Sequence, residues 1–204
     1  MAIDLSEAFS VEGFRAALQN GGARSNQFRV QLNFPAFVSS GFYAADAAQF
    51  LVTAASLPGS TVNQTMLYYR GREVKLAGER VFQPWSITVI NDTGFTMRNA
   101  FDEWMNGINN LADNSGLLVP SDYQSDFTVT QLDRNSMPLK AYSLQSAFPV
   151  DVTDVPLDFG ANDQISSFNV TFAYQTYTTQ WDGSGDDGST PPVAQFSQSV
   201  NQTS

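Results

Sequence analysis

The sequence predicts a mainly β fold: a two-sheet β-sandwich or barrel with one flanking α-helix. Most stretches that carry large apolar residues alternate them with polar ones, which is the period of a half-buried strand. One stretch instead has a broad apolar stripe at helical spacing, and Gly, Pro, Asn and Asp mark turns between the stretches. Because unpaired strand edges aggregate, we expect the sheets either to close or to pair between subunits.

The chain has 204 residues, the size of one domain, and its composition divides it into three parts. Residues 1–24 are predicted to be an N-terminal helical arm, in which residues 6–19 form a helix that stops at an Asn-Gly-Gly segment. Residues 25–182 are predicted to be the β-domain. Residues 183–204 form a polar C-terminal tail with few large apolar residues, so we expect it to lie on a neighbouring subunit rather than fold alone.

The strands are predicted from alternation and from the turn signals that end them. The first strand alternates Phe28 and Val30 with polar residues, and the last places Phe168 and Val170 on one face. Between them, the Ala-Gly-Glu segment at 77–79 is predicted to turn a hairpin. In chain order the predicted strands cover residues 27–34, 49–56, 61–70, 74–76, 81–82, 85–89, 127–129, 142–144 and 165–177.

One long helix is predicted at residues 95–108. Its apolar residues recur at i, i+3, i+4, i+7, i+8 and i+11, and polar residues occupy the opposite face. The stripe consists of Met97, Ala100, Phe101, Trp104, Met105 and Ile108. We expect Trp85, Phe101 and Trp104 to be core residues that join this helix to the sheets, not a platform for a ligand.

The composition excludes most catalytic chemistry. The chain contains no His and no Cys, which removes the usual catalytic triads, zinc sites and disulfides. Carboxylates at Asp102 and Glu103, or at Asp151, Asp154 and Asp158, could supply an acid and a base, but solvated loops and a helix's polar face account for them. We therefore expect no enzymatic activity, no cofactor and no metal site.

The charge distribution points to protein partners. A formal net charge of −10 argues against sequence-independent binding of nucleic acid, and no apolar run is long enough to suggest membrane insertion. Seven of the ten basic residues lie in residues 1–80, whereas fourteen of the twenty acidic residues lie in 81–204, which suggests opposed faces that meet head to tail. The basic stretch at 70–80 is either a phosphate-binding patch or, as we favour, a hairpin that forms salt bridges with another protein.

Residues 69–106 carry a specific resemblance. A basic strand enters an Ala-Gly-Glu-Arg segment at 77–80, followed by an aromatic residue, a Trp-Ser-Ile-Thr-Val strand, an Asn-Asp pair and a helix with Phe-x-x-Trp near its end. In this order the segments resemble the tail tube proteins of contractile, T-even-like bacteriophages. Weaker collinear similarity extends over residues 25–177, and the departures are an insertion around 37–48 and the C-terminal tail.

The resemblance implies a structural virion protein, a subunit of the inner tail tube of a contractile phage tail. It implies that the sheets of neighbouring copies join into a ring-shaped barrel. The hexameric rings then stack into a tube, with an acidic channel through which DNA passes without specific binding. Implied partners are further copies of the chain, the tail sheath protein, and baseplate and tail terminator proteins. The virion is the implied location, after assembly in the host cytoplasm. The inter-ring contact is then expected at Arg70, Arg72, Glu73, Lys75, Glu79 and Arg80.

Alternatives from other classes stay open at this point. The chain could be the tube protein of a related contractile secretion or toxin-delivery machine, which shares the fold. It could be a monomeric ligand-binding β-sandwich, which predicts an exposed aromatic platform, or an enzyme that uses carboxylates. Only the tube interpretations predict rings or filaments in a micrograph.

Overall fold

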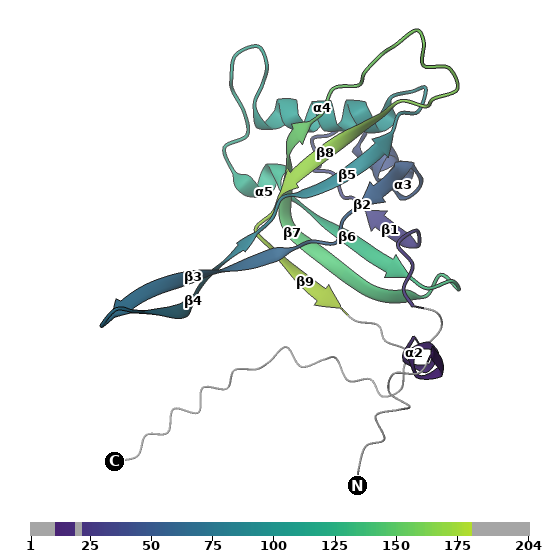
Figure 1. Ribbon diagram of the computed structural model, residues 1–204. Coiled ribbons are helices and arrows are strands. Elements are labelled where there is room, and N and C mark those ends of the chain that lie inside the picture. Colours follow the sequence, from purple (N-terminus) through teal and green to yellow (C-terminus); the bar gives the residue numbers. More distant parts are fainter. Residues whose placement is uncertain (1–10, 19–21, 181–204) are drawn as a thin grey trace.

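The computed structural model describes residues 11–18 and 22–180 of the chain. Figure 1 shows a bent sheet with helices along one side and a long hairpin that projects from the other end. Helix α2 (Val11–Ala17) begins the described chain and ends two residues before the predicted end at 19. The start of that predicted helix, at residues 6–10, and the predicted tail lie outside the described residues.

Seven antiparallel strands form one continuous sheet, which confirms the mainly β prediction. The order along the sheet is β1-β6-β7-β8-β5-β2, and β9 also pairs with β7. The strands are β1 (Phe28–Gln31), β2 (Val52–Ala55), β5 (Trp85–Ile90), β6 (Ser125–Leu132), β7 (Pro138–Val152), β8 (Ser167–Ala173) and β9 (Thr176–Gln180). Strands β1 and β2 end the path, so among the described strands the sheet of one chain does not close into a barrel.

Strand β7 is where the sheet bends. One edge of β7 pairs with β6, whereas the other edge pairs with β9 at residues 141–145 and with β8 at residues 148–152. Between these two pairings Ser146 has a φ of 55°, and its backbone N–H donates to the Asp126 carboxylate at 2.8 Å. The bend divides the sheet into two halves that enclose a common core.

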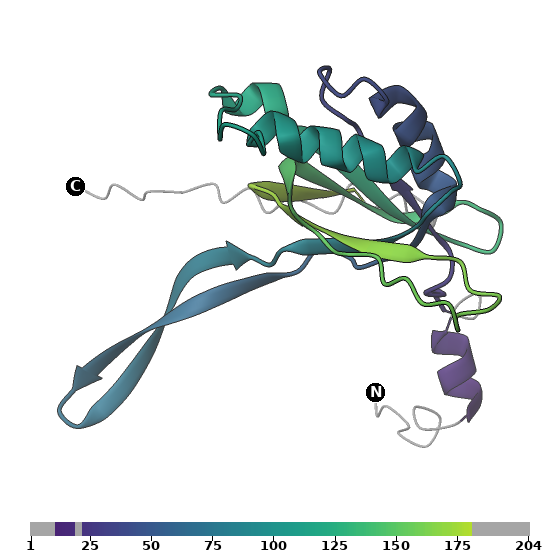
Figure 2. The same ribbon diagram turned by 90° about the horizontal axis from the view of Figure 1, so that it is seen from above.

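Helices α4 (Thr96–Ile108), α3 (Gly41–Leu51) and α5 (Pro120–Tyr123) lie on one side of the sheet, as Figure 2 shows from above. Helix α4 agrees with the predicted helix at 95–108. Trp85, Phe101 and Trp104 are 1%, 0% and 0% exposed, and they lie in the core between α4 and the sheet. The indole N–H groups of both tryptophans are satisfied, because Trp85 donates to the Ser56 carbonyl at 2.6 Å and Trp104 to the Tyr123 carbonyl at 2.8 Å.

Helix α3 corrects the predicted strand at 49–56 and occupies much of the insertion around 37–48. The chain is helical up to Leu51, and β2 occupies only the last part of the predicted strand. The buried stripe of α3 consists of small residues, including Ala44 and Ala48 at helical spacing, so the helix packs closely on α4 and on both end strands of the sheet. Its large apolar side chains are exposed instead, which hides the helical period in the sequence: Phe42, Tyr43 and Phe50.

The predicted hairpin turn at 77–79 is wrong. Strand β4 (Arg72–Phe82) runs through this segment and pairs with β3 (Ser60–Tyr69), and the turn lies at Arg70 and Gly71. Both turn residues have positive φ, 48° and 79°, as a two-residue hairpin turn of the primed type requires. Gly78 instead marks a register shift, where a Cβ atom would lie 2.9 Å from the Asn63 carbonyl oxygen.

Candidate functional site

The β3–β4 hairpin projects from the body of the molecule in both views (Figures 1 and 2). Residues 61–77 along it are exposed on both of its faces. An isolated two-stranded hairpin is marginally stable in water, and apolar side chains on it favour contact with another surface. The hairpin is therefore the candidate functional site, and the surface that completes it must come from outside the described part of this chain.

The register of the strands separates two faces of the distal hairpin. Directly paired residues share a face, and the faces alternate along each strand. The apolar face pairs Leu67 with Val74 and Tyr69 with Arg72, and Leu76 extends it toward the base. The charged face pairs Met66 with Lys75 and Tyr68 with Glu73.

The hairpin residues predicted as a contact fall into two groups. Arg70, Arg72, Glu73 and Lys75 lie together in the distal half, where three bases face one acid. Lys75 Nζ lies 3.6 Å from a Glu73 carboxylate oxygen, and the Arg70 guanidinium lies 5.4 Å from the centre of the Tyr69 ring. These contacts are solvent-exposed and contribute little to the stability of the fold. The tip therefore presents a surplus of positive charge.

Glu79 and Arg80, the other two predicted contact residues, lie near the base of the hairpin. Arg80 Nη1 donates to the Ser60 hydroxyl at 3.0 Å, which links β4 to the first residue of β3. Glu79 lies where the register shifts. The structure thus places these two residues away from the four at the tip. Their position suits a role in stabilising the base of the hairpin.

An aromatic cluster fixes the direction of the hairpin at its base, and the sequence analysis missed it. Phe82 lies 5.8 Å from Tyr174 and 5.6 Å from Tyr177 between ring centres. The Tyr174 hydroxyl donates to the Gly59 carbonyl at 3.3 Å, and the Tyr177 hydroxyl lies 3.3 Å from that of Ser60. Partial burial, with a smaller contribution from Tyr177, raises the pKa of Tyr174 above its ordinary value. The sequence carries one sign of this cluster: the alternation of apolar and polar residues along the last strand breaks after Tyr174.

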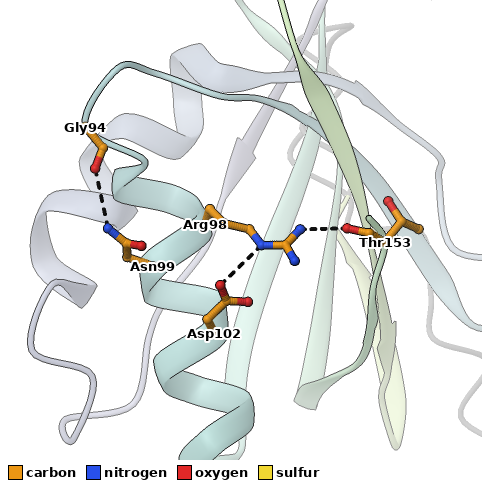
Figure 3. A network of polar contacts seen from close by, with 5 residues as sticks. All are labelled: Gly94, Arg98, Asn99, Asp102 and Thr153. Atoms are coloured by element: carbon orange, nitrogen blue, oxygen red, sulfur yellow. Dashed lines mark hydrogen bonds and ion pairs between the residues drawn. The ribbon is translucent and has the colours of Figure 1, made fainter. Parts of the chain in front are cut away.

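A second polar network ties helix α4 to the far end of the sheet (Figure 3). Arg98 donates to the Asp102 carboxylate at 3.3 Å and to the Thr153 carbonyl at 2.6 Å. Its guanidinium also lies 5.2 Å from the centre of the Phe168 ring. Asn99 donates to the Gly94 carbonyl at 3.4 Å, within the segment that begins the helix.

Asp92 satisfies the first backbone N–H of helix α4, although the N-cap position itself is Phe95. Its carboxylate accepts hydrogen bonds from the Thr96 backbone N–H at 2.9 Å and from the Thr96 hydroxyl at 2.8 Å. Burial acts to raise the pKa of Asp92, but these hydrogen bonds outweigh it and hold the pKa below its ordinary value. The Asn-Asp pair read from the sequence is therefore a helix start.

Two of the carboxylates considered for acid–base catalysis have structural partners. Asp102 is paired with Arg98, and the Glu103 carboxylate accepts two hydrogen bonds from Ser39, each at 3.0 Å. Within residues 11–18 and 22–180, no group of three or more acidic side chains is arranged to hold a metal ion. Over the same residues, the helices are too short or too polar to span a membrane.

Comparison with known proteins gives one consistent result. A family model described as phage tail tube protein matches residues 23–180. The tail tube protein of Serratia phage KSP90 is 29% identical over 167 residues, which cover 81% of this chain and 94% of that protein. Tail tube protein gp19 of Enterobacteria phage T4 is 27% identical over 169 residues, which cover 80% of this chain and 96% of that protein.

A solved structure shares the fold. A chain in the sheath–tube complex of an extracellular contractile injection system, in its extended state, superposes with a TM-score of 0.57 at 14% identity. The superposition covers 89% of this chain and 99% of that chain. At this identity the likeness is one of fold.

Proposed function

The chain belongs to the phage tail tube protein family, and from this membership we propose that it is the repeating subunit of the inner tube of a contractile phage tail. The observation that carries the proposal is the family match over residues 23–180, which includes the whole hairpin and sheet. The protein is then a structural component of the virion, assembled in the host cytoplasm, and has no catalytic role.

The tube is built from hexameric rings that stack on one another. Two features support assembly from copies of this chain: the end strands β1 and β2 each have one open edge among the described strands, and the hairpin is exposed on both faces. Strand edges that pair between neighbours around a ring leave no free edge. A contact between unlike surfaces, repeated with a rotation, then extends the rings into a filament.

The channel of the tube lets DNA pass without binding it. A channel wall past which DNA slides needs few exposed Lys or Arg side chains, because these side chains neutralise phosphates and would bind the DNA. The chain has 20 acidic residues and 10 basic residues, and most of the acids lie in residues 81–204. We expect some of these acids, and few unpaired bases, to face the channel.

The outer partners are the tail sheath protein along the tube and the baseplate and tail terminator proteins at its two ends. The likeness in fold to a chain of a sheath–tube complex supports the sheath as a partner. The same likeness keeps a related injection machine as the alternative. The phage description of the matching family and of both curated relatives favours the phage tail.

Electron microscopy of the purified chain tests the proposal. Wild-type protein should form rings or tubes that are visible in negative stain. A hairpin triple variant, Arg70→Glu with Arg72→Glu and Lys75→Glu, should stop elongation while keeping the circular dichroism spectrum of the fold. Reversal of Arg134, an exposed base in the β6–β7 turn, is the matched control and should leave the tubes intact. Wild-type protein that stays monomeric at every concentration and salt tested would contradict the proposal.

A further inference from the structure

The loop between β7 and β8, residues 153–166, exposes large apolar side chains. Leu157 is 90% exposed, Ile165 is 73% exposed, and Phe159 is fully exposed. Leu157 and Ile165 line the same hollow, whose volume is about 330 Å³. That volume is at the lower end of the ~300–1,000 Å³ of small-ligand pockets, so the hollow suits one or two side chains rather than a folded element.

The β7–β8 loop is also acidic. It contains Asp154, Asp158 and Asp163 and no Lys or Arg. All three aspartates are exposed, and Asp158 lines the hollow beside the apolar residues. None of the three is in an ion pair with another described residue. The surface therefore combines a hollow of mixed polar and apolar lining with exposed apolar side chains and unpaired negative charge, which suits a partner that is both apolar and basic.

The apolar face of the hairpin tip has the complementary chemistry. Tyr69 is 66% exposed and Leu67 is 51% exposed, and Arg72 lies opposite Tyr69 on the same face. Arg70 stacks on the Tyr69 ring. Neither arginine is in an ion pair with a described residue. An aromatic ring flanked by two guanidinium groups matches, in apolar character and in charge, a hollow that Leu157, Ile165 and Asp158 line in an acidic loop.

The two surfaces lie at opposite ends of the molecule. Strands β5 and β8 pair from Trp85 with Phe172 to Ile90 with Ser167. The hairpin leaves the sheet at the Trp85 end of this ladder, whereas the β7–β8 loop leaves it at the Ser167 end. Six residues of β5 separate the ends by about 20 Å at ~3.4 Å per residue. Figures 1 and 2 agree that the hairpin points away from the loop, so the partner surface is that of another copy.

The two ends of the β7–β8 loop are fixed to the segment around the start of α4. The Thr153 carbonyl accepts the hydrogen bond from Arg98 shown in Figure 3. At the other end, Asn91 donates from its backbone N–H to the Ser166 carbonyl at 2.9 Å and from its side chain to the Ser166 hydroxyl at 3.1 Å. A surface held in place before contact loses less conformational entropy on binding.

We propose that the β7–β8 loop is the receptor for the hairpin tip of a second copy of this chain. The hollow takes the Tyr69 ring, and Arg70 and Arg72 pair with the aspartates around it. The contact joins unlike surfaces, so it propagates from copy to copy in one direction. The inference rests on the proposed function, because it names the surface that the hairpin meets in the assembly.

Complementation between two charge-reversed variants tests the pairing. The acidic-tip variant carries Arg70→Glu and Arg72→Glu, and the basic-loop variant carries Asp154→Lys and Asp158→Lys. Each alone should fail to sediment as an assembly while keeping its circular dichroism spectrum. Mixed in equal amounts they should assemble, because each acidic tip then meets a basic loop and each native tip a native loop. Normal assembly of the basic-loop variant alone, or a mixture that stays dissociated, would overturn the pairing.

Cysteine cross-linking tests proximity and uses a chain that has no cysteine of its own. Tyr69→Cys combined with Leu157→Cys should give a ladder of disulfide-linked multimers under mild oxidation, whereas each single variant gives dimers at most. The matched control combines Tyr69→Cys with Leu118→Cys, because Leu118 is 95% exposed in a different loop and should give no ladder.

The outcomes separate this inference from the proposed function. Tubes in the microscope without a ladder from the Tyr69 and Leu157 pair would overturn the receptor and leave the tube function standing. Absence of any ring or tube from the wild-type chain would overturn both.

Discussion

Replacing Trp104 by alanine tests whether helix α4 is held to the sheet as the core contacts indicate. The Trp104 side chain is fully buried and lies 5.4 Å from the Phe34 ring, 6.0 Å from Phe127 and 6.5 Å from Phe172 between ring centres. Its indole N–H also satisfies the Tyr123 carbonyl. Burial of this kind makes Trp→Ala cost about 3–5 kcal/mol, of which about 1 kcal/mol is the lost hydrogen bond.

The expected result is a fall of about 4 kcal/mol in the free energy of unfolding, measured by urea denaturation. The measurement belongs in the background of the hairpin triple variant, because self-assembly would otherwise add to the apparent stability. Trp104→Phe keeps an aromatic ring and loses the N–H, so it should cost about 1–2 kcal/mol. Leu118→Ala, at a 95% exposed position, should stay within about 0.5 kcal/mol of the parent. A loss under about 1 kcal/mol for Trp104→Ala would show that this side chain does not hold helix α4 to the sheet.

Three further predictions concern other parts of the chain. Asp92→Ala should lower the free energy of unfolding by about 1 kcal/mol at pH 7, because it removes the acceptor for the Thr96 N–H and hydroxyl. Folding lowers the pKa of Asp92, so its contribution to the free energy of unfolding should be full above about pH 4 and be lost as the pH falls below that. A variant that loses stability in parallel with the parent in acid would contradict this. Gly78→Val should disrupt the hairpin and block tube formation, as seen by electron microscopy, because the Asn63 carbonyl leaves no room for a Cβ; normal tubes would count against the register shift. Deletion of 183–204 should weaken tube assembly or its resistance to heat without unfolding the domain, and tubes of unchanged melting temperature would show that the tail does not bridge subunits.

The elements that could be predicted from the sequence are those that bury one face and expose the other. Alternation in β1, β5 and β8 and the apolar stripe of α4 each reflect one face against a common core, so period alone locates them. The resemblance of the segment at 69–106 is confirmed by the family match over residues 23–180. Charge composition also placed four basic residues on one hairpin, although Arg80 lies near its base rather than at the tip.

The failures have physical causes. Helix α3 buries alanines and exposes aromatics, the reverse of the pattern that periodicity detects. Both faces of the distal hairpin are exposed, so nothing in its alternation marks the turn. The Ala-Gly-Glu segment is typical of a turn, whereas Gly78 allows close backbone approach within a strand. The tyrosines at the hairpin base and the β7–β8 loop depend on strand pairings far apart in the chain, which no local pattern specifies.

Cryo-electron microscopy of the assembled wild-type protein would show directly whether the chain forms the tube. We expect six-fold rings stacked into a tube with an open channel, in which acidic side chains outnumber unpaired basic ones along the wall. A preparation that contains only monomers, or a channel lined by a net positive ring at every level, would contradict this expectation.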